Sequence, residues 1–300
     1  MKRKTVRATL LCLVVVALLA ITAAPAKAII GGQQDTTNNY SNVGVVSVIY
    51  QDEEGGEFWD LGGSCTLVRN DPGNVIVLTA AHCVDYVVGE GGVGIQNMRI
   101  SFDPLLTHVG GTPLTGSYSI AKYEIHPVYL EALATTPRLA NSKMFGIGLG
   151  REDVALLWLD TPRSRGFKDP PIPGLEPSQV IGEGGLAGVD LKSQTFTVAG
   201  YGFNGFVTGS IMSNAISVLW SGRNYKEVGV VSTEDLTGDR YLKLSECICF
   251  GDSGGPAFLG DTDTIASLAV WVGSARCRGP AYEYRLDTAL AHDFLDLYLD

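Results

Sequence analysis

The chain has 300 residues and a formal net charge of −10, with 45% hydrophobic and 18% charged residues. The charged fraction lies below the ~25% of an average globular chain, so the composition excludes disorder over most of the length. The negative charge also argues against a nucleic-acid partner, which would require a basic face.

The first 28 residues have the composition of an export signal. Four basic residues within the first seven positions precede an apolar run over residues 8–24, and Ala26-Lys27-Ala28 supplies the small-x-small pattern that signal peptidase reads. The run is short for a membrane span, and no later stretch approaches ~20 uninterrupted apolar residues. We therefore expect residues 1–28 to be a cleaved signal peptide. The mature protein should be secreted (extracellular or periplasmic) and free of membrane contact, in a compartment where disulfides persist.

After the signal, runs of β-branched and apolar residues alternate with clusters of Gly, Asn, Asp and Pro. These runs predict strands at Val43–Tyr50, Val75–Thr79, Met98–Phe102, Val154–Leu159, Thr195–Val198, Ile216–Leu219 and Thr264–Val272. Irregular stretches predict surface loops at Glu53–Glu57, Gly89–Gly94, Glu131–Gly150 and Pro162–Gly185. The segment Asp287–Asp300 differs, because apolar residues recur there at helical spacing and Asp287 could cap the helix. Many strands and one terminal helix favour an all-β barrel or sandwich.

Residue types used in catalysis gather in four short motifs. In chain order they are IIGG at 29–32, TAAHC at 79–83, EDVALL at 152–157 and GDSGGP at 251–256. His82 stands at the end of one predicted strand, and Asp153 opens another. Ser253 lies between glycines, whose lack of side chains bares the surrounding backbone amides.

Together and in this order, the four motifs resemble those of the chymotrypsin-like (trypsin-like) serine peptidases, and the resemblance covers the whole mature chain. Lesser landmarks of the family are GGSC at 62–65, IHP at 125–127 and AGYG at 199–202. The resemblance implies an all-β fold of two six-stranded antiparallel Greek-key barrels with a C-terminal α-helix. Residues 29–165 would form the N-terminal barrel and residues 166–300 the C-terminal barrel and terminal helix, together one peptidase domain over 29–300.

The resemblance also implies a role for each motif residue, and the chemistry fits the residue types. A serine hydroxyl is a weak nucleophile unless a base removes its proton, and a neutral imidazole can do so near pH 7. His82 would be that base and Ser253 the nucleophile, while Asp153 would fix the tautomer of His82 and stabilise its imidazolium. The backbone amides of Gly251 and Ser253 would form the oxyanion hole. We therefore expect a serine endopeptidase that works through an acyl-enzyme.

The start of the mature chain carries a second expectation from the family. A new ammonium group at the Ile-x-Gly-Gly motif pairs with the aspartate just before the catalytic serine, here Ile29 with Asp252. The expected signal-peptidase cut after Ala28 falls immediately before Ile29. Export itself would then activate the enzyme without a zymogen stage.

Six cysteines are present, and one of them lies in the signal. By family position, Cys65 would bridge Cys83. Cys247 and Cys249 are rivals for Cys277, and family position favours Cys249. Cys247 is then left over, an odd thiol in an exported protein.

Cys247 also stands six residues before Ser253, where relatives have the floor of the primary specificity pocket. A protonated thiol has no charge, so we expect apolar or small residues before the scissile bond and little cleavage after Arg or Lys. Gly273 and Ala281 are the expected pocket walls. No serine precedes Trp271 or Val272, so the hydroxyl that relatives aim at the catalytic aspartate is in doubt.

Three alternative functions compete with this interpretation. A non-catalytic binding protein on the same scaffold is opposed by the intact triad. An α/β-hydrolase elbow at Ser253 would need several βα units after it, but the remaining chain carries one helix. The glycines of 89–94 fit a dinucleotide motif but lack a following helix.

We expect no cofactor, because no His or Cys cluster has metal-ligand spacing and residues 98–113 lack the paired glutamates of a calcium loop. The expected partners are polypeptide substrates and protein protease inhibitors, with the enzyme itself a monomer.

Overall fold

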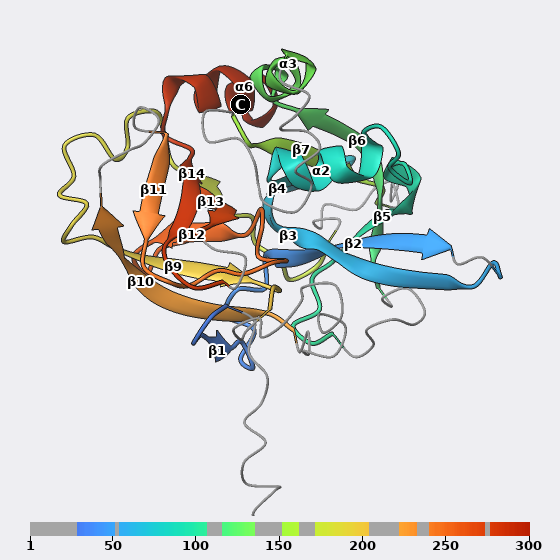
Figure 1. The fold of residues 1–300 in the computed structure, drawn as a ribbon, viewed down its shortest axis with the longest axis horizontal. Coiled ribbons are helices and arrows are strands. Elements are labelled where there is room, and N and C mark those ends of the chain that lie inside the picture. Colours follow the sequence, from blue (N-terminus) through green and yellow to red (C-terminus); the bar gives the residue numbers. More distant parts are fainter. Residues whose placement is uncertain are drawn as a thin grey trace, which may run out of the picture.

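The computed structural model describes residues 29–51, 54–106, 116–135, 152–161, 172–203, 222–232, 240–273 and 277–300. Two sheets, each closed into a barrel, lie side by side, the first in blue to green and the second in yellow to red (Figure 1). The all-β prediction of two six-stranded antiparallel barrels with a C-terminal helix is confirmed. The predicted signal peptide and the predicted strand at 216–219 lie outside the described residues.

Six antiparallel strands form the first barrel. They are β2 (Val43–Gln51), β3 (Glu57–Asp71), β4 (Asn74–Thr79), β5 (Met98–Ser101), β6 (Tyr118–Ile125) and β7 (Ala155–Leu159). They pair in the order β2-β3-β4-β7-β6-β5, and β5 returns to β2. The first seven residues of β2 are all buried, because its two faces serve two cores. Val46 and Val48 belong to the core of this barrel. Val43 and Val45 belong to the core that continues through the second barrel.

The second barrel contains β9 (Thr195–Gly200), β10 (Asn224–Ser232), β11 (Tyr241–Leu244), β12 (Pro256–Leu259), β13 (Thr264–Val272) and β14 (Ala281–Arg285). The order is β10-β11-β14-β13-β12-β9, and β9 pairs with β10 to close the ring. Two short strands extend this sheet: β1 (Gln33–Gln34) pairs with β10, and β8 (Gln179–Val180) runs parallel to β13. The N-terminal strand is therefore bonded to the second barrel.

The described residues contain three α-helices, α2 (Ala81–Val88), α3 (Pro127–Thr135) and α6 (Ala289–Leu299), and the 3-10 turn η1 (Ile95–Asn97). None of them is long and apolar enough to cross a membrane. Two predictions were wrong in detail. His82 lies in the first turn of α2 and not at a strand end, and α3 occupies the start of the predicted loop at 131–150, whose remainder lies outside the described residues.

The cap of the terminal helix was also mispredicted by one residue. The side chain of Thr288 accepts a hydrogen bond from the Ala291 backbone N–H at 3.2 Å, so Thr288 is the N-cap. Asp287 is instead used elsewhere. Its carboxylate accepts from the Leu186 backbone N–H at 3.0 Å and pairs with Arg285 at 2.9 Å.

The C-terminal helix joins the two barrels. α6 follows the last strand of the second barrel, yet its end lies against the first (Figure 1). The Arg69 guanidinium of β3 donates to the carbonyl oxygens of Tyr298, at 3.1 Å, and Leu299. Trp158 of β7 meets the Tyr298 ring edge-on, with centroids 5.4 Å apart.

A buried ion pair ties the N-terminal segment to the second barrel. Arg223 Nε lies 2.8 Å from Asp35 Oδ2, and both side chains are fully buried. The guanidinium also donates to the Val43 carbonyl oxygen at 2.8 Å. A buried ion pair stabilises the folded state little compared with well-packed apolar residues of the same size. Removing one partner is strongly destabilising, because the other charge is then buried without a counter-charge.

We therefore expect Asp35→Ala to lower the free energy of unfolding by about 3–5 kcal/mol, measured by urea denaturation. The matched control is Glu124→Ala, which removes the partner of Lys122 from a half-exposed pair. That change should cost no more than about 1 kcal/mol. Equal losses in the two variants would contradict the prediction.

Candidate active site

Two paired strands bring His82 and Asp153 together. β4 ends at Thr79 and β7 begins at Ala155, and these two residues are direct partners in the ladder. The His82 backbone N–H donates to Asp153 Oδ1 at 2.9 Å, and His82 Nδ1 lies 2.8 Å from Oδ2. With the proton on Nδ1, the neutral ring keeps Nε2 as its basic nitrogen. The pair therefore has the geometry of a base held by its orienting carboxylate.

Opposing effects set the pKa of His82. Burial lowers it, but the Asp153 carboxylate and the Cys83 side chain raise it more, so the pKa lies well above its ordinary 6.5. The side chain is still 26% exposed, so the ring can be approached from solvent.

The turn that carries Ser253 is docked on the first barrel beside His82. The Ser253 carbonyl oxygen accepts from the Ser64 backbone N–H at 2.7 Å and lies 3.6 Å from Cys83 Sγ. A Cβ added to Gly254 would lie 2.2 Å from Thr79 Oγ1, so any larger residue would push the turn away. The structure thus places Ser253 next to the first turn of α2.

Gly251 is held in a conformation that suits glycine. Its φ is +94°, and an added Cβ would lie 2.0 Å from Leu61 Cδ2. Ser64 Oγ donates to the Gly251 carbonyl oxygen at 2.9 Å, which fixes the peptide plane. Within the described part of the chain, the backbone N–H groups of Gly251 and Ser253 donate to no protein acceptor. Both amides are therefore available to an oxyanion. The sequence interpretation missed Ser64 as a support, although it lies in the GGSC landmark.

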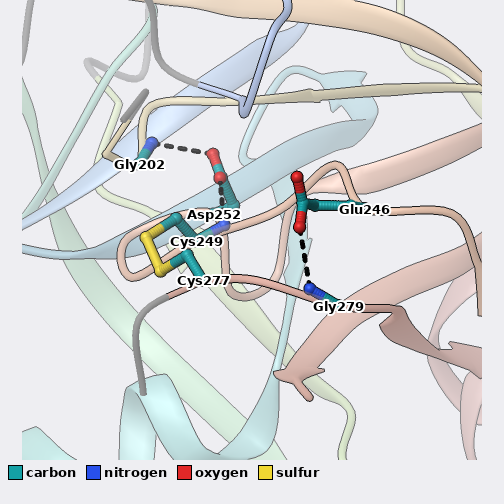
Figure 2. The surroundings of a disulfide bond; sticks show 6 residues. All are labelled: Gly202, Glu246, Cys249, Asp252, Cys277 and Gly279. Carbon is teal, nitrogen blue, oxygen red and sulfur yellow. Dashed lines mark hydrogen bonds between the residues drawn. A yellow bond between two sulfur atoms is a disulfide. The ribbon is translucent and has the colours of Figure 1, made fainter. Parts of the chain in front are cut away.

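Asp252 is fully buried, and its carboxylate lies between Gly202 and Cys249 (Figure 2). Its Oδ1 accepts from the Gly202 backbone N–H at 2.7 Å and its Oδ2 from the Cys249 backbone N–H at 2.8 Å. Burial raises the pKa of Asp252 to about 7, although the two hydrogen bonds act in the opposite direction. A cation is the partner that would return this carboxyl to its ordinary charged state.

Ile29, expected to supply that cation, is fully buried in the core. Its neighbour Ile30 donates its backbone N–H to the Cys247 carbonyl oxygen at 2.7 Å and accepts at its own carbonyl from Lys226 Nζ at 3.0 Å. The start of the mature segment is therefore seated close to the loop before Ser253. In the intact chain Ile29 is joined to Ala28 and has no ammonium group.

Cysteine pairing follows the expectation once and departs from it once. Cys249 and Cys277 form a disulfide (Figure 2). Cys65 and Cys83 are both buried free thiols, so the second expected bridge is absent. Gly63, not Cys65, faces Cys83: a Cβ on Gly63 would lie 2.7 Å from Cys83 Sγ and 3.6 Å from its Cβ, the Cβ separation of a disulfide. Gly63 thus lies opposite Cys83 at the separation that a bridging cysteine would need.

The expected specificity site combines residues from three segments. Cys247 is a fully buried free thiol, and Ala281 is buried where β14 pairs with Val272 and Leu244. Gly273 donates its backbone N–H to the Pro280 carbonyl oxygen at 3.0 Å.

No hydroxyl group donates to Asp153 within the described residues, as the missing serine before Trp271 suggested. Asp153 accepts hydrogen bonds only from His82 there. Trp271 packs against Tyr282, with the two rings tilted by 36° and their centroids 4.5 Å apart.

Other motif residues lie away from this site. His292, which an α/β-hydrolase would need as its base, bonds Asp296 and the Ile181 carbonyl oxygen. Residues 89–94 follow helix α2 rather than a strand, unlike a dinucleotide-binding loop. No group of three or more His, Cys, Asp or Glu side chains in the described ranges could hold a metal ion.

One acidic residue of the site escaped the sequence interpretation. Glu283 is fully buried in β14, two residues after Ala281, and its charge acts on Cys247. The signal that could have revealed it is the position of a lone acid among the apolar residues Ala281, Tyr282 and Tyr284.

Comparisons with known proteins agree with this architecture. The chain is similar to the structure titled HL collagenase, with 17% identity and a TM-score of 0.56 over 90% of this chain and 96% of that one. A mutant of human heparin binding protein is similar at 16% identity and a TM-score of 0.57, over 90% and 96%. An inactivated protease paralogue of the scabies mite is similar at 16% identity and a TM-score of 0.53, over 90% and 95%. No curated protein matches the chain.

Structural likeness at this level of identity concerns the fold alone. The family model described as Trypsin matches residues 29–291, a range that includes all four motifs and both barrels. The chain belongs to the Trypsin family.

Proposed function

We propose that the mature chain is a secreted serine endopeptidase that cleaves polypeptides through a Ser253–His82–Asp153 triad and an acyl-enzyme. The observation that carries the proposal is the seating of the Ser253 turn beside α2, where His82 makes two hydrogen bonds to Asp153.

In this mechanism, His82 Nε2 takes the proton of Ser253 Oγ as the oxygen attacks the substrate carbonyl carbon. The oxyanion that forms accepts hydrogen bonds from the N–H groups of Gly251 and Ser253. The imidazolium, stabilised by Asp153, then protonates the leaving amine. Water attacks the acyl-enzyme with the same base, which returns the free serine.

A non-catalytic binding protein is the competing function, because the similar structures include proteins named heparin binding protein and inactivated protease paralogue. This chain retains a histidine, an aspartate and a serine at the three motif positions. We expect a fluorophosphonate to label the chain that begins at Ile29, and Ser253→Ala to abolish the labelling. A folded wild-type chain that resists the reagent would favour the binding protein.

The pH dependence of activity follows from the pKa of His82. A general base works only when neutral, and the pKa of His82 is raised above 6.5, so activity is lost as the pH falls through the raised value. We expect kcat/KM for an uncharged peptide substrate to rise with pH to a plateau, with its midpoint above pH 6.5. Circular dichroism over the same range controls for unfolding. A midpoint at or below 6.5 would contradict the assignment.

Localisation and activation belong to the same proposal. Signal peptidase would cut after Ala28, and the new Ile29 ammonium would pair with Asp252 in the secreted monomer. Amino-terminal sequencing of the exported protein tests the cut, since a start upstream of Ile29 on an inactive form would exclude activation by export.

The preference for apolar or small residues before the scissile bond rests on the uncharged thiol of Cys247, and it stays a prediction. Glu283, whose charge acts on that cysteine, argues for the opposite preference.

A further inference from the structure

Glu283 carries a buried ionisable group without a partner. The residue is fully buried, and neither carboxyl oxygen has a hydrogen-bond partner among the described residues. Glutamate is almost never fully buried unless it is paired, because taking a carboxylate out of water costs several kcal/mol. An unsatisfied carboxyl at this depth therefore indicates a partner that the described residues do not supply.

The strand places this carboxyl at the expected specificity site. Residues 281 and 283 of β14 point to the same face of the sheet, because side chains alternate along a strand. Ala281 is one expected wall of the site, and the Glu283 charge acts on both Cys247 at its floor and Asp252 beside Ser253.

The other charged groups near Cys247 already have partners. Lys226 donates its Nζ to the carbonyl oxygens of Ile30, at 3.0 Å, and Glu246, at 2.8 Å. The Glu246 carboxylate accepts from the Gly279 backbone N–H at 2.8 Å (Figure 2). Asp252 accepts two backbone hydrogen bonds. Glu283 is thus the carboxyl at this site that still lacks a donor.

We propose that Glu283 selects the substrate residue before the scissile bond, by pairing its carboxylate with the ammonium of a lysine or the guanidinium of an arginine. The inference rests on the proposed peptidase function. It assigns the acidic group of the pocket to strand β14, because the floor position holds Cys247.

The protonation state of Glu283 gives the proposal a second consequence. Burial, and to a smaller extent the charge of Asp252, raise the pKa of Glu283 well above its ordinary value. Without a bound cation, the Glu283 carboxyl therefore stays protonated to a higher pH than a free glutamate side chain. A cation that binds there displaces the proton to solvent. Three other titratable groups, Cys247, Asp252 and Lys226, face this region. Cys247 and Asp252 become negative as the pH rises, which also favours a cation, and the Lys226 ammonium already donates to the Ile30 carbonyl oxygen. Cation binding should accordingly strengthen as the pH rises.

The experiment uses the chain that begins at Ile29 and fluorogenic peptides that differ only in the residue before the cut: Arg, Lys, Leu or Ala. We expect kcat/KM for the Arg and Lys peptides to exceed that for the Leu and Ala peptides. Glu283→Gln should lower the former on the order of 10²–10³-fold and change the latter less than about threefold. p-Aminobenzamidine, an aromatic amidine cation, should bind the wild type more tightly at pH 8 than at pH 6 and lose affinity by a similar factor in Glu283→Gln.

Glu183→Gln is the matched control, because Glu183 is exposed on the second half of the chain, and it should leave all four rates unchanged. Glu283→Asp keeps the charge and should keep the preference for Arg or Lys, which guards against a glutamine variant that fails to fold. Fluorophosphonate labelling together with faster cleavage after Leu or Ala in the wild type would overturn the inference and leave the peptidase function standing. An unchanged preference in a labelled Glu283→Gln would overturn it as well. A folded wild type without labelling would instead overturn the peptidase function on which the inference rests.

Discussion

Asp153→Asn is expected to lower kcat by about 10⁴-fold while leaving the fold intact. The asparagine side chain has nearly the same shape, but its NH₂ group is a donor and cannot accept the Nδ1–H of His82. The ring would then turn its other tautomer toward Ser253 and present an N–H where a base is needed. The His82 backbone N–H donates to Oδ1 at 2.9 Å, so an asparagine oxygen would stay at that position and its NH₂ group would face Nδ1, 2.8 Å from Oδ2 in the wild type.

The measurement is kcat for a peptide substrate at the pH plateau, with urea denaturation as the check on the fold. Thr161→Ser, a conservative change just beyond β7, is a control that should leave kcat within about twofold, since conservative substitutions away from a site change little. A loss below tenfold in a folded Asp153→Asn would show that Asp153 does not orient His82.

A chain that retains Ala28 before Ile29 is expected to be about 10²–10³-fold less active than the chain that begins at Ile29. Among the described residues, fully buried Asp252 has only two backbone donors, so we expect its ionised form to be stabilised by the Ile29 ammonium. Leaving a buried charge without its partner costs about 3–5 kcal/mol, and Asp252 precedes the nucleophile directly. The comparison is between purified chains that begin at Ile29 and at Ala28, assayed with the same substrate. Equal activities would exclude the ion pair as the activating step.

The same carboxyl gives the two chains different pH profiles of stability. Without the ammonium, the pKa of Asp252 is about 7 in the folded chain against 3.8 for the free side chain. A raised pKa stabilises the fold at low pH, and this contribution disappears as the pH rises from about 4 to 7, a loss of about 4 kcal/mol. The chain that begins at Ala28 should show this loss by urea denaturation. The chain that begins at Ile29 should not, and Asp252→Asn should remove the loss from the longer chain.

Short motifs such as GDSGGP were sufficient to predict the proposed triad, and the structure places His82 on Asp153 with the Ser253 turn beside them. The motifs were insufficient where the strand register decides which residue of β3 faces Cys83. Cys65 carries the right residue type for a bridge to Cys83, yet the strand turns Gly63 toward that thiol. Glu283 was overlooked because its importance depends on burial and on the absence of a donor, and neither can be read from a string of residue types. The helix over 127–135 was missed because an apolar run with little amphipathic pattern indicates no particular structure.

The close contact of Gly254 with the first barrel has a consequence for how activity is lost on heating. The proposed nucleophile Ser253 belongs to one barrel and the proposed base His82 to the other, and the turn packs against β3 and β4 with no room for even a methyl group on Gly254. The proposed activity therefore depends on the contact between the two barrels and not on either barrel alone. A separation of the barrels too small to alter secondary structure would already abolish that activity. Loss of hydrolysis on heating should precede the loss of the far-ultraviolet signal, so that enzymatic activity reports the seating of one barrel on the other.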